Sequence, residues 1–110
     1  MMENDTLRGL YDVVQNRKTS KQEGSYTCYL FEQGLDKILK KCGEECAEMI
    51  IAAKNAGTEE LKNEMCDLIY HMLVLMAERE VPLDEVMEIL EQRRQKIGNL
   101  KQFHSVDRES

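Results

Sequence analysis

The chain has 110 residues, of which 42% are hydrophobic and 33% are charged, and it carries a formal net charge of −6. A chain of this size forms one domain with a modest core, so we treat residues 1–110 as a single domain. The negative charge argues against a general nucleic-acid binder, and no apolar run approaches the roughly 20 residues that cross a membrane.

The N-terminus and the cysteines indicate a cytoplasmic protein. The first five residues lack the basic and apolar regions of a secretory signal. The cysteines form no CxxC pair and have no histidine at zinc-finger spacing. Cys42 and Cys46 lie four residues apart on a predicted helix and could share a soft metal ion. Two thiolates alone are weak evidence for such a site. We expect all four thiols to be free, as small buried hydrophobic side chains in a reducing compartment.

The composition predicts an all-α protein, because the chain has only one Pro and six Gly. Apolar residues at helical spacing between residues 7 and 14 predict a first helix, with Thr6 as a candidate cap and an end near Arg17. Residues 18–27 are polar and rich in Ser, Thr and Gly, so they predict a connecting loop.

Three further helical segments follow the loop. After a short helical turn at residues 29–31, a 3.6-residue repeat predicts a helix from Leu35 to Lys54, ended by a Gly57 stop. Thr58 is a candidate cap for the next helix, which extends to Ala77. A last helix begins at residue 83 after a Val-Pro pair and continues to about residue 97, which leaves a polar tail from about residue 98.

The helix that follows Thr58 is apolar nearly all round from Leu68 onward, so it needs partners on several sides. Three companion helices in so small a chain do not suffice. We therefore expect four main helices in a helical bundle that is completed by dimerisation, most simply as a two-fold homodimer.

Two acidic clusters lie within these apolar helical patterns. Their spacing, EExxE at residues 44–48 and ExxD at residues 64–67, places each cluster on one helix face, so two facing helices would point the carboxylates into one space. Oxygen ligands suit Mg²⁺ or Mn²⁺, and a carboxylate-held Mg²⁺ is the usual means of handling substrate phosphates. The alternative is that these acids form solvated helix faces. The predicted metal ligands are Glu44, Glu45, Glu48, Glu64 and Asp67.

Lysines precede the first acidic cluster on the same broad face. Lys37, Lys40 and Lys41 are candidates to contact phosphate oxygens, and the alternative is that they form ordinary intrahelical ion pairs with the glutamates. His71 lies four residues after Asp67 and so on the same face, where it is a candidate to contact a phosphate or to support a metal ligand, although a lone histidine beside a tyrosine more often forms structural hydrogen bonds.

Three segments carry a resemblance to a known family. They are Ser25-Tyr26-Thr27, the stretch GLDKILKKCGEECAE at residues 34–48, and EMCDLIYH at residues 64–71. Together they resemble phosphoribosyl-ATP pyrophosphatase, a member of the all-α nucleoside-triphosphate pyrophosphatase superfamily. The match extends from about Leu7 to Arg94. Cys46 and Cys66 stand where small apolar residues are expected in relatives, which affects packing more than chemistry.

The resemblance implies Mg²⁺-dependent hydrolysis of phosphoribosyl-ATP to phosphoribosyl-AMP and pyrophosphate, the second step of histidine biosynthesis. It implies that the acidic residues hold Mg²⁺ on the triphosphate, with Glu45 or Glu48 as the catalytic base that accepts a proton from water. It also implies that the substrate contacts Ser25, Tyr26, Thr27, Lys37, Lys40, Lys41 and His71. Some relatives are fused to the cyclohydrolase that acts next, and we expect that activity on another chain.

Two other functions fit parts of the pattern. One is a house-cleaning pyrophosphatase of the same superfamily, which acts on ordinary or damaged nucleoside triphosphates. The other is a non-catalytic helical dimer that serves as an interaction module. Phosphate release from different nucleotides and Mg²⁺ binding distinguish the three.

Overall fold

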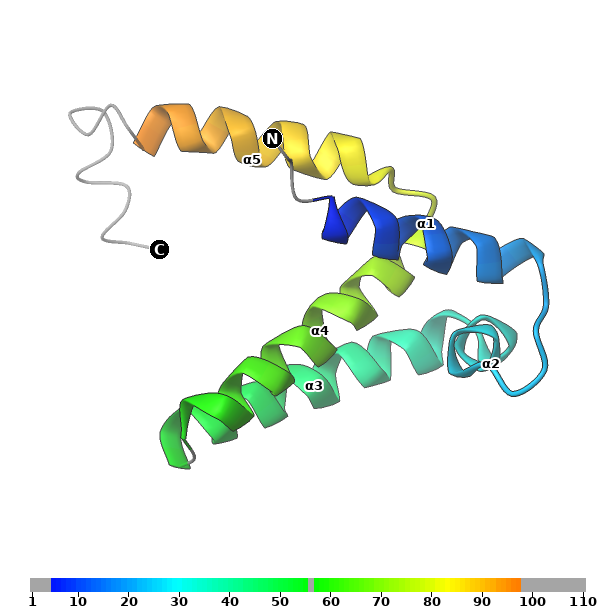
Figure 1. Ribbon diagram of the computed structural model, residues 1–110, viewed down its shortest axis with the longest axis horizontal. Helices are drawn as coiled ribbons and strands as arrows, with labels where there is room; N and C mark the ends of the chain where they lie inside the picture. The colour runs from blue at the N-terminus through cyan, green and yellow to red at the C-terminus, as the bar shows by residue number, and fades with distance from the viewer. Residues whose placement is uncertain (1–4, 56, 98–110) are drawn as a thin grey trace.

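The computed structural model describes residues 5–55 and 57–97. These residues form five helices and contain no strand, which confirms the all-α prediction (Figure 1). The helices are α1 (Thr6–Thr19), α2 (Tyr26–Gln33), α3 (Leu35–Asn55), α4 (Thr58–Glu78) and α5 (Leu83–Ile97). The four main helices of the prediction are α1, α3, α4 and α5.

The segment between α1 and α3 differs from the predicted loop over residues 18–27. The first helix extends two residues beyond Arg17, and α2 begins at Tyr26, so the connection is confined to residues 20–25. The predicted turn at residues 29–31 is the middle of α2, because Ser25 accepts a hydrogen bond from the Cys28 amide and starts the helix earlier.

The predicted caps of α1 and α4 are each displaced by one residue. Asp5 occupies the N-cap of α1, and Gly57 occupies the N-cap of α4, so Thr6 and Thr58 are the first helical residues. Neither cap residue makes a side-chain capping bond. The predicted tail from about residue 98 lies outside the described residues.

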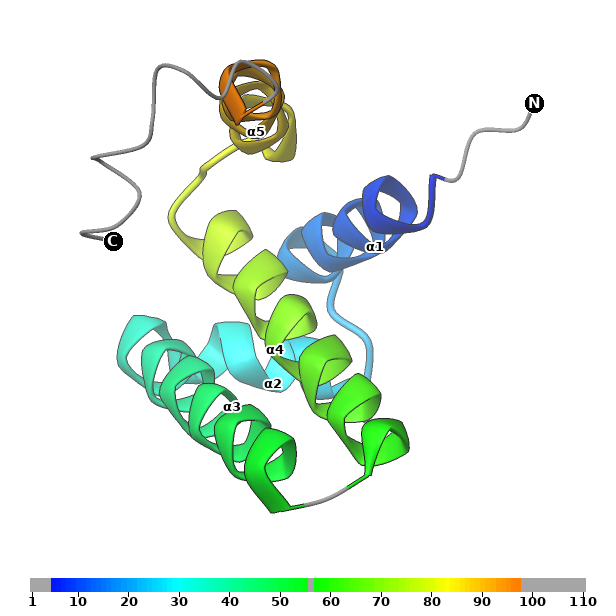
Figure 2. The ribbon, with the colours of Figure 1, turned by 90° about the vertical axis from the view of Figure 1, so that its left-hand side faces the viewer.

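The long helices α3 and α4 form an antiparallel pair that makes the most extensive contacts between any two helices (Figure 2). Helix α2 lies across one end of this pair, and α1 crosses α4. Gly34 joins α2 to α3 with a φ of 94°, a left-handed value that only glycine adopts without strain. None of the described helices combines the length and apolar character needed to cross a membrane.

The core lies where these four helices meet. One cluster contains Val14 of α1, Leu30 of α2, Ile38 of α3 and Val74 of α4, each at most 1% exposed. A second cluster joins Tyr11, Leu73 and Leu83, and thereby ties the start of α5 to α1 and α4. Burying side chains of this size stabilises the fold by about 1.5–3 kcal/mol each relative to leaving them in water. The packing fixes how α3 and α4 face each other.

All four cysteines are free thiols in the structure. Cys28 is buried and Cys42 and Cys46 are partly buried, but Cys66 is exposed on α4, so the predicted burial is wrong for Cys66. Burial raises the pKa of the Cys42 thiol, so this side chain behaves as a small hydrophobe within the helix pair.

Candidate functional site

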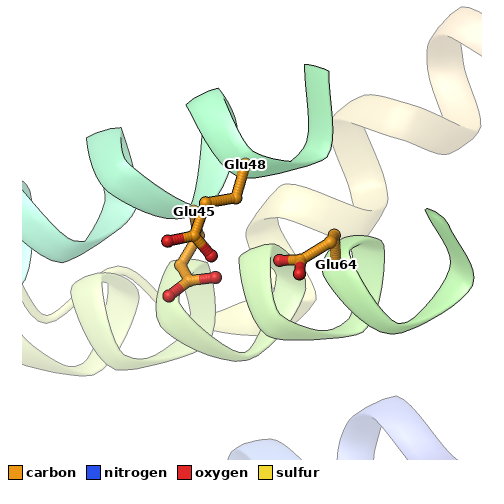
Figure 3. A group of neighbouring side chains, drawn as sticks. All are labelled: Glu45, Glu48 and Glu64. Carbon is orange, nitrogen blue, oxygen red and sulfur yellow. The ribbon is translucent and has the colours of Figure 1, made fainter. Parts of the chain in front are cut away.

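The antiparallel pair of α3 and α4 brings three of the predicted carboxylates together. Glu45 and Glu48 are three residues apart on α3, and Glu64 faces them from α4 (Figure 3). One carboxylate oxygen from each of the three residues lies within 4.8 Å of the others. The two helices therefore converge their acids on one small space, as the spacing of the motifs predicts.

Two carboxylate oxygens of this cluster are buried without a hydrogen-bond partner among the described residues. Glu45 is only 7% exposed, and its Oε1 atom has no hydrogen-bond partner among the described residues. The Oε1 atom of Glu64 is in the same situation. A buried acceptor with no partner costs about 1–3 kcal/mol, and more if it is charged, so such atoms call for a ligand.

The surroundings of Glu64 are rich in negative charge. Burial and the nearby carboxylates of Glu48, Asp67 and Glu45 raise the pKa of Glu64 above its ordinary value. A divalent cation would reverse this effect by stabilising the ionised form. Oxygen ligands alone are the preference of hard cations such as Mg²⁺, so the donor set and its unpartnered oxygens fit such an ion.

The other two predicted ligands lie beside the cluster. Asp67 is exposed on α4, one turn after Glu64, and is close enough to raise the pKa of Glu64. The carboxylate of Glu44 turns instead towards lysines, 3.2 Å from Lys41 and 3.9 Å from Lys40. In this arrangement Glu44 balances the charge of its neighbours, whereas Asp67 stands next to the convergent carboxylates.

The lysines of α3 form a basic line that ends at the carboxylates. Lys41 is 3.7 Å from Glu45, and the hydrogen bond that it donates to Glu44 raises the pKa of its ammonium group. Lys40 is more exposed and contacts Glu44 alone. Lys37 lies one turn earlier, with Nζ 5.9 Å from the ring centroid of Tyr29. Lys40 and Lys41 thus form the intrahelical ion pairs with glutamates that were the alternative to phosphate contact.

The side chains of the Ser-Tyr-Thr segment form hydrogen bonds within the protein. Ser25 Oγ accepts from the amide of Cys28 at 3.1 Å and caps α2. The hydroxyl of Thr27 bonds to that of Tyr70, and the hydroxyl of Tyr26 lies 3.0 Å from His71 Nε2. Two adjacent residues of α2 are therefore fastened to two adjacent residues of α4.

His71 is 5% exposed, and both of its ring nitrogens are engaged. Its Nδ1 atom lies 2.8 Å from the backbone carbonyl of Asp67, which can only accept, so the proton resides on Nδ1. Nε2 then accepts the hydrogen bond from the Tyr26 hydroxyl. In these contacts His71 plays the structural hydrogen-bonding role that was the alternative to phosphate contact.

Two aromatic residues near the site were missed by sequence reasoning. In the sequence, Tyr70 stands out only as a neighbour of His71, and Tyr29 falls in the predicted turn at residues 29–31. The available signal was the helical spacing of Tyr26 and Tyr29, which places both rings on one face once α2 begins at Tyr26. Burial raises the pKa of the Tyr70 hydroxyl, in keeping with its half-buried bond to Thr27.

The sequence is similar to known proteins over most of its length. The profile of the phosphoribosyl-ATP pyrophosphohydrolase family matches residues 7–94. A phosphoribosyl-ATP pyrophosphatase of Clostridium botulinum is 54% identical over 92% of both chains. One from Clostridium acetobutylicum is 51% identical over 93% of both chains. One from Listeria innocua is 55% identical over 84% of this chain and 88% of its own.

Proposed function

This chain belongs to the phosphoribosyl-ATP pyrophosphohydrolase family, and from that premise we propose that it hydrolyses phosphoribosyl-ATP to phosphoribosyl-AMP and pyrophosphate, the second step of histidine biosynthesis. The observation that carries the proposal is the convergence of Glu45, Glu48 and Glu64 across two helices. A triphosphate carries several negative charges, so these carboxylates can meet it only through a cation. We propose that the chain acts in the cytoplasm, where free thiols such as these persist.

We propose Mg²⁺ as the cofactor, held by Glu45, Glu48 and Glu64 with Asp67 beside them. The unpartnered Oε1 atoms of Glu45 and Glu64 support this assignment. When bound, Mg²⁺ supplies positive charge that neutralises the phosphates and stabilises the charge that develops on the leaving pyrophosphate. Glu44 contributes by holding Lys40 and Lys41 in place.

We propose that Glu48 accepts the proton of the attacking water. Glu48 is exposed, so water reaches it directly, whereas Glu45 is buried next to Lys41 and is better placed as a ligand. The α,β-phosphoanhydride bond then breaks, the water oxygen stays on phosphoribosyl-AMP, and pyrophosphate leaves. The lysine line of Lys37, Lys40 and Lys41 lies where it can bind phosphate oxygens.

The decisive experiment is product analysis. The purified chain is incubated with phosphoribosyl-ATP and Mg²⁺, and pyrophosphate is measured against orthophosphate. We expect pyrophosphate only, with loss of activity in EDTA and recovery in excess Mg²⁺. Orthophosphate would mean cleavage at another bond, full activity after removal of metal would contradict the Mg²⁺ assignment, and faster turnover of dNTPs would indicate a house-cleaning enzyme.

Variants separate the base from the ligand. Glu48→Gln is expected to lower kcat by about 100-fold or more, the usual contribution of a general base, while Mg²⁺ binding in calorimetry weakens less than in Glu45→Gln, because Glu45 and Glu64 still hold the ion. Glu45→Gln is expected to weaken Mg²⁺ binding itself. Glu59→Gln, an exposed acid in the first turn of α4, is the matched control and should change neither property. Near-native kcat in Glu48→Gln would remove it from the base role.

We also propose that the working form is a homodimer, because large apolar side chains remain exposed on three helices. Helix α5 extends away from α3 and α4 (Figure 1), and none of its helix–helix contacts is extensive. A 15-residue helix is marginal in water without partners. The large apolar side chains of α3, α4 and α5 that are 43–62% exposed are Leu39, Ile50, Ile51, Met65, Ile69, Met72, Met87, Ile89, Leu90 and Ile97.

An apolar hollow adds to this surface. A cavity of about 380 Å³ between α1 and α4 is lined by Leu7, Leu10, Cys66 and Ile69. Such a hollow in contact with water is unfavourable unless another apolar surface fills it. We propose that a second copy of the chain covers this hollow and the exposed faces of α4 and α5.

A further inference from the structure

Two tyrosine rings on α2 are exposed side by side. Tyr26 is 44% exposed and Tyr29 is 40% exposed, so each residue presents a large part of its surface to solvent. Their centroids are 6.0 Å apart and their planes are inclined by only 27°. Both rings line an open cavity of about 590 Å³, which is within the size range of small-molecule sites.

The protein holds the Tyr26 ring, against which the Tyr29 ring stacks, in a defined orientation. The hydroxyl of Tyr26 bonds to His71, whose other ring nitrogen is anchored on the Asp67 carbonyl. The ring of Tyr26 also meets the His71 ring edge-on, at a centroid distance of 5.8 Å and an angle of 77°. A ring held in this way loses little freedom when a ligand stacks beside it, so binding costs less entropy.

The tyrosine pair is connected to the carboxylates by the lysine line. Lys37 lies over the Tyr29 ring at 5.9 Å. Lys41 is one turn further along α3 and is 3.7 Å from Glu45. Lys37, Lys41 and Glu45 therefore follow one another at four-residue steps along α3, and the tyrosine pair of α2 lies at the Lys37 end of this line.

We propose that Tyr29, supported by Tyr26, is the stacking surface for the purine ring of the substrate. The inference deepens the proposed function and rests on it. A nucleotide with its base on Tyr29 places its phosphates along Lys37 and Lys41, with the triphosphate directed to the carboxylates. The purine offers a flat π-face that stacks on an aromatic side chain, and the Tyr29 ring provides one without needing its hydroxyl group.

The test compares two variants of Tyr29 in the full chain with Mg²⁺. Tyr29→Leu keeps an apolar side chain but removes the ring, and Tyr29→Phe keeps the ring. We measure AMP and ribose 5-phosphate binding by calorimetry, and KM and kcat for phosphoribosyl-ATP. Stacking of one base on one ring predicts that Tyr29→Leu weakens AMP binding and raises KM by about 10-fold or more, with kcat changed much less.

The controls distinguish this inference from the proposed function. Tyr29→Phe should bind AMP like the wild type, and ribose 5-phosphate, which lacks a base, should bind all three proteins equally. An unchanged AMP affinity in Tyr29→Leu would overturn the stacking role even if pyrophosphate release is normal. Equal losses in both variants would also overturn it, because they would point to the hydroxyl group. Absence of pyrophosphate release by the wild type would refute the activity, while the AMP comparison still tests the stacking surface.

Discussion

Three carboxylates in one small space repel one another unless a proton or a cation lies between them. At Glu64, burial and the charges of Glu48, Asp67 and Glu45 raise the pKa of the carboxyl group above its ordinary value. A carboxyl whose pKa is higher in the folded than in the unfolded chain binds its proton more tightly when folded. The folded state therefore loses stability as the pH rises from the unfolded value near 4.5 through the folded value.

Glu64→Gln is expected to stabilise the metal-free protein at neutral pH, since the amide cannot ionise. In EDTA, the variant should melt at a higher temperature than the wild type at pH 7, and the difference should shrink towards pH 4. Added Mg²⁺ should raise the melting temperature of the wild type more than that of the variant. Circular dichroism melts at equal protein concentration provide the measurement.

The matched control is Glu60→Gln, which neutralises an exposed acid in the first turn of the same helix. It should leave both the pH profile and the response to Mg²⁺ unchanged. A Glu64→Gln variant that is less stable than the wild type in EDTA at pH 7 would contradict the repulsion described here.

The motif spacing was sufficient to predict that acids of two helices face one another, because helical periodicity alone sets which side chains share a face. The spacing did not predict that Glu44 and Glu45 have different surroundings. Both belong to the same motif, but Glu45 is buried against α4 while Glu44 turns towards Lys40 and Lys41. That difference depends on the packing of α3 against α4, which spacing along one helix does not contain.

Helix α2 is the element that the sequence described least well. The polar run before it hides its start, since Tyr26 and Thr27 look like loop residues until their partners on α4 are known. The signal that was present locally is Ser25, a preferred N-cap residue three positions before Cys28. Tertiary bonds to Tyr70 and His71 then determine where the helix lies, and no local pattern predicts them.

Ser25→Ala is expected to destabilise the fold by about 1 kcal/mol, because it removes the cap of α2, whereas Ser25→Gly should cost only a few tenths. The expected fall in melting temperature for the alanine variant is about 4–8 °C in a domain of this size. Urea denaturation monitored by circular dichroism measures the difference.

The same pair of variants tests the predicted contact of Ser25 with substrate. If the hydroxyl acts only as a cap, both variants keep a near-native KM for phosphoribosyl-ATP at a temperature where they are folded. A large rise in KM in both variants, with wild-type stability in Ser25→Ala, would assign the hydroxyl to the substrate instead.

For the molecule as a whole, the apolar character of α4 led to the expectation of a dimer, and the described chain leaves apolar faces of α4 and α5 uncovered. Composition and periodicity predict that such faces need a partner. They do not predict that α5 extends away from the other helices. In the structure, the only buried residue of α5 is Leu83, at its first position.

Leu90→Glu is expected to weaken the dimer, because it places a charge in the exposed apolar face of α5, where Leu90 is 50% exposed. Light scattering after gel filtration should give twice the chain mass of 12.8 kDa for the wild type and a smaller mass for the variant at the same concentration. Gln92→Glu adds the same charge on the opposite side of α5 and should remain dimeric. A monomeric wild type would contradict the proposal.

The position of Cys66 has a practical consequence. Its exposed thiol lines the hollow between α1 and α4, whereas the buried Cys28 and the partly buried Cys42 and Cys46 lie elsewhere. Without any engineering, the chain therefore offers one accessible attachment point for a spin label or fluorophore next to the surface assigned to the second copy. Labelling kinetics at this thiol report on assembly independently of hydrodynamic size.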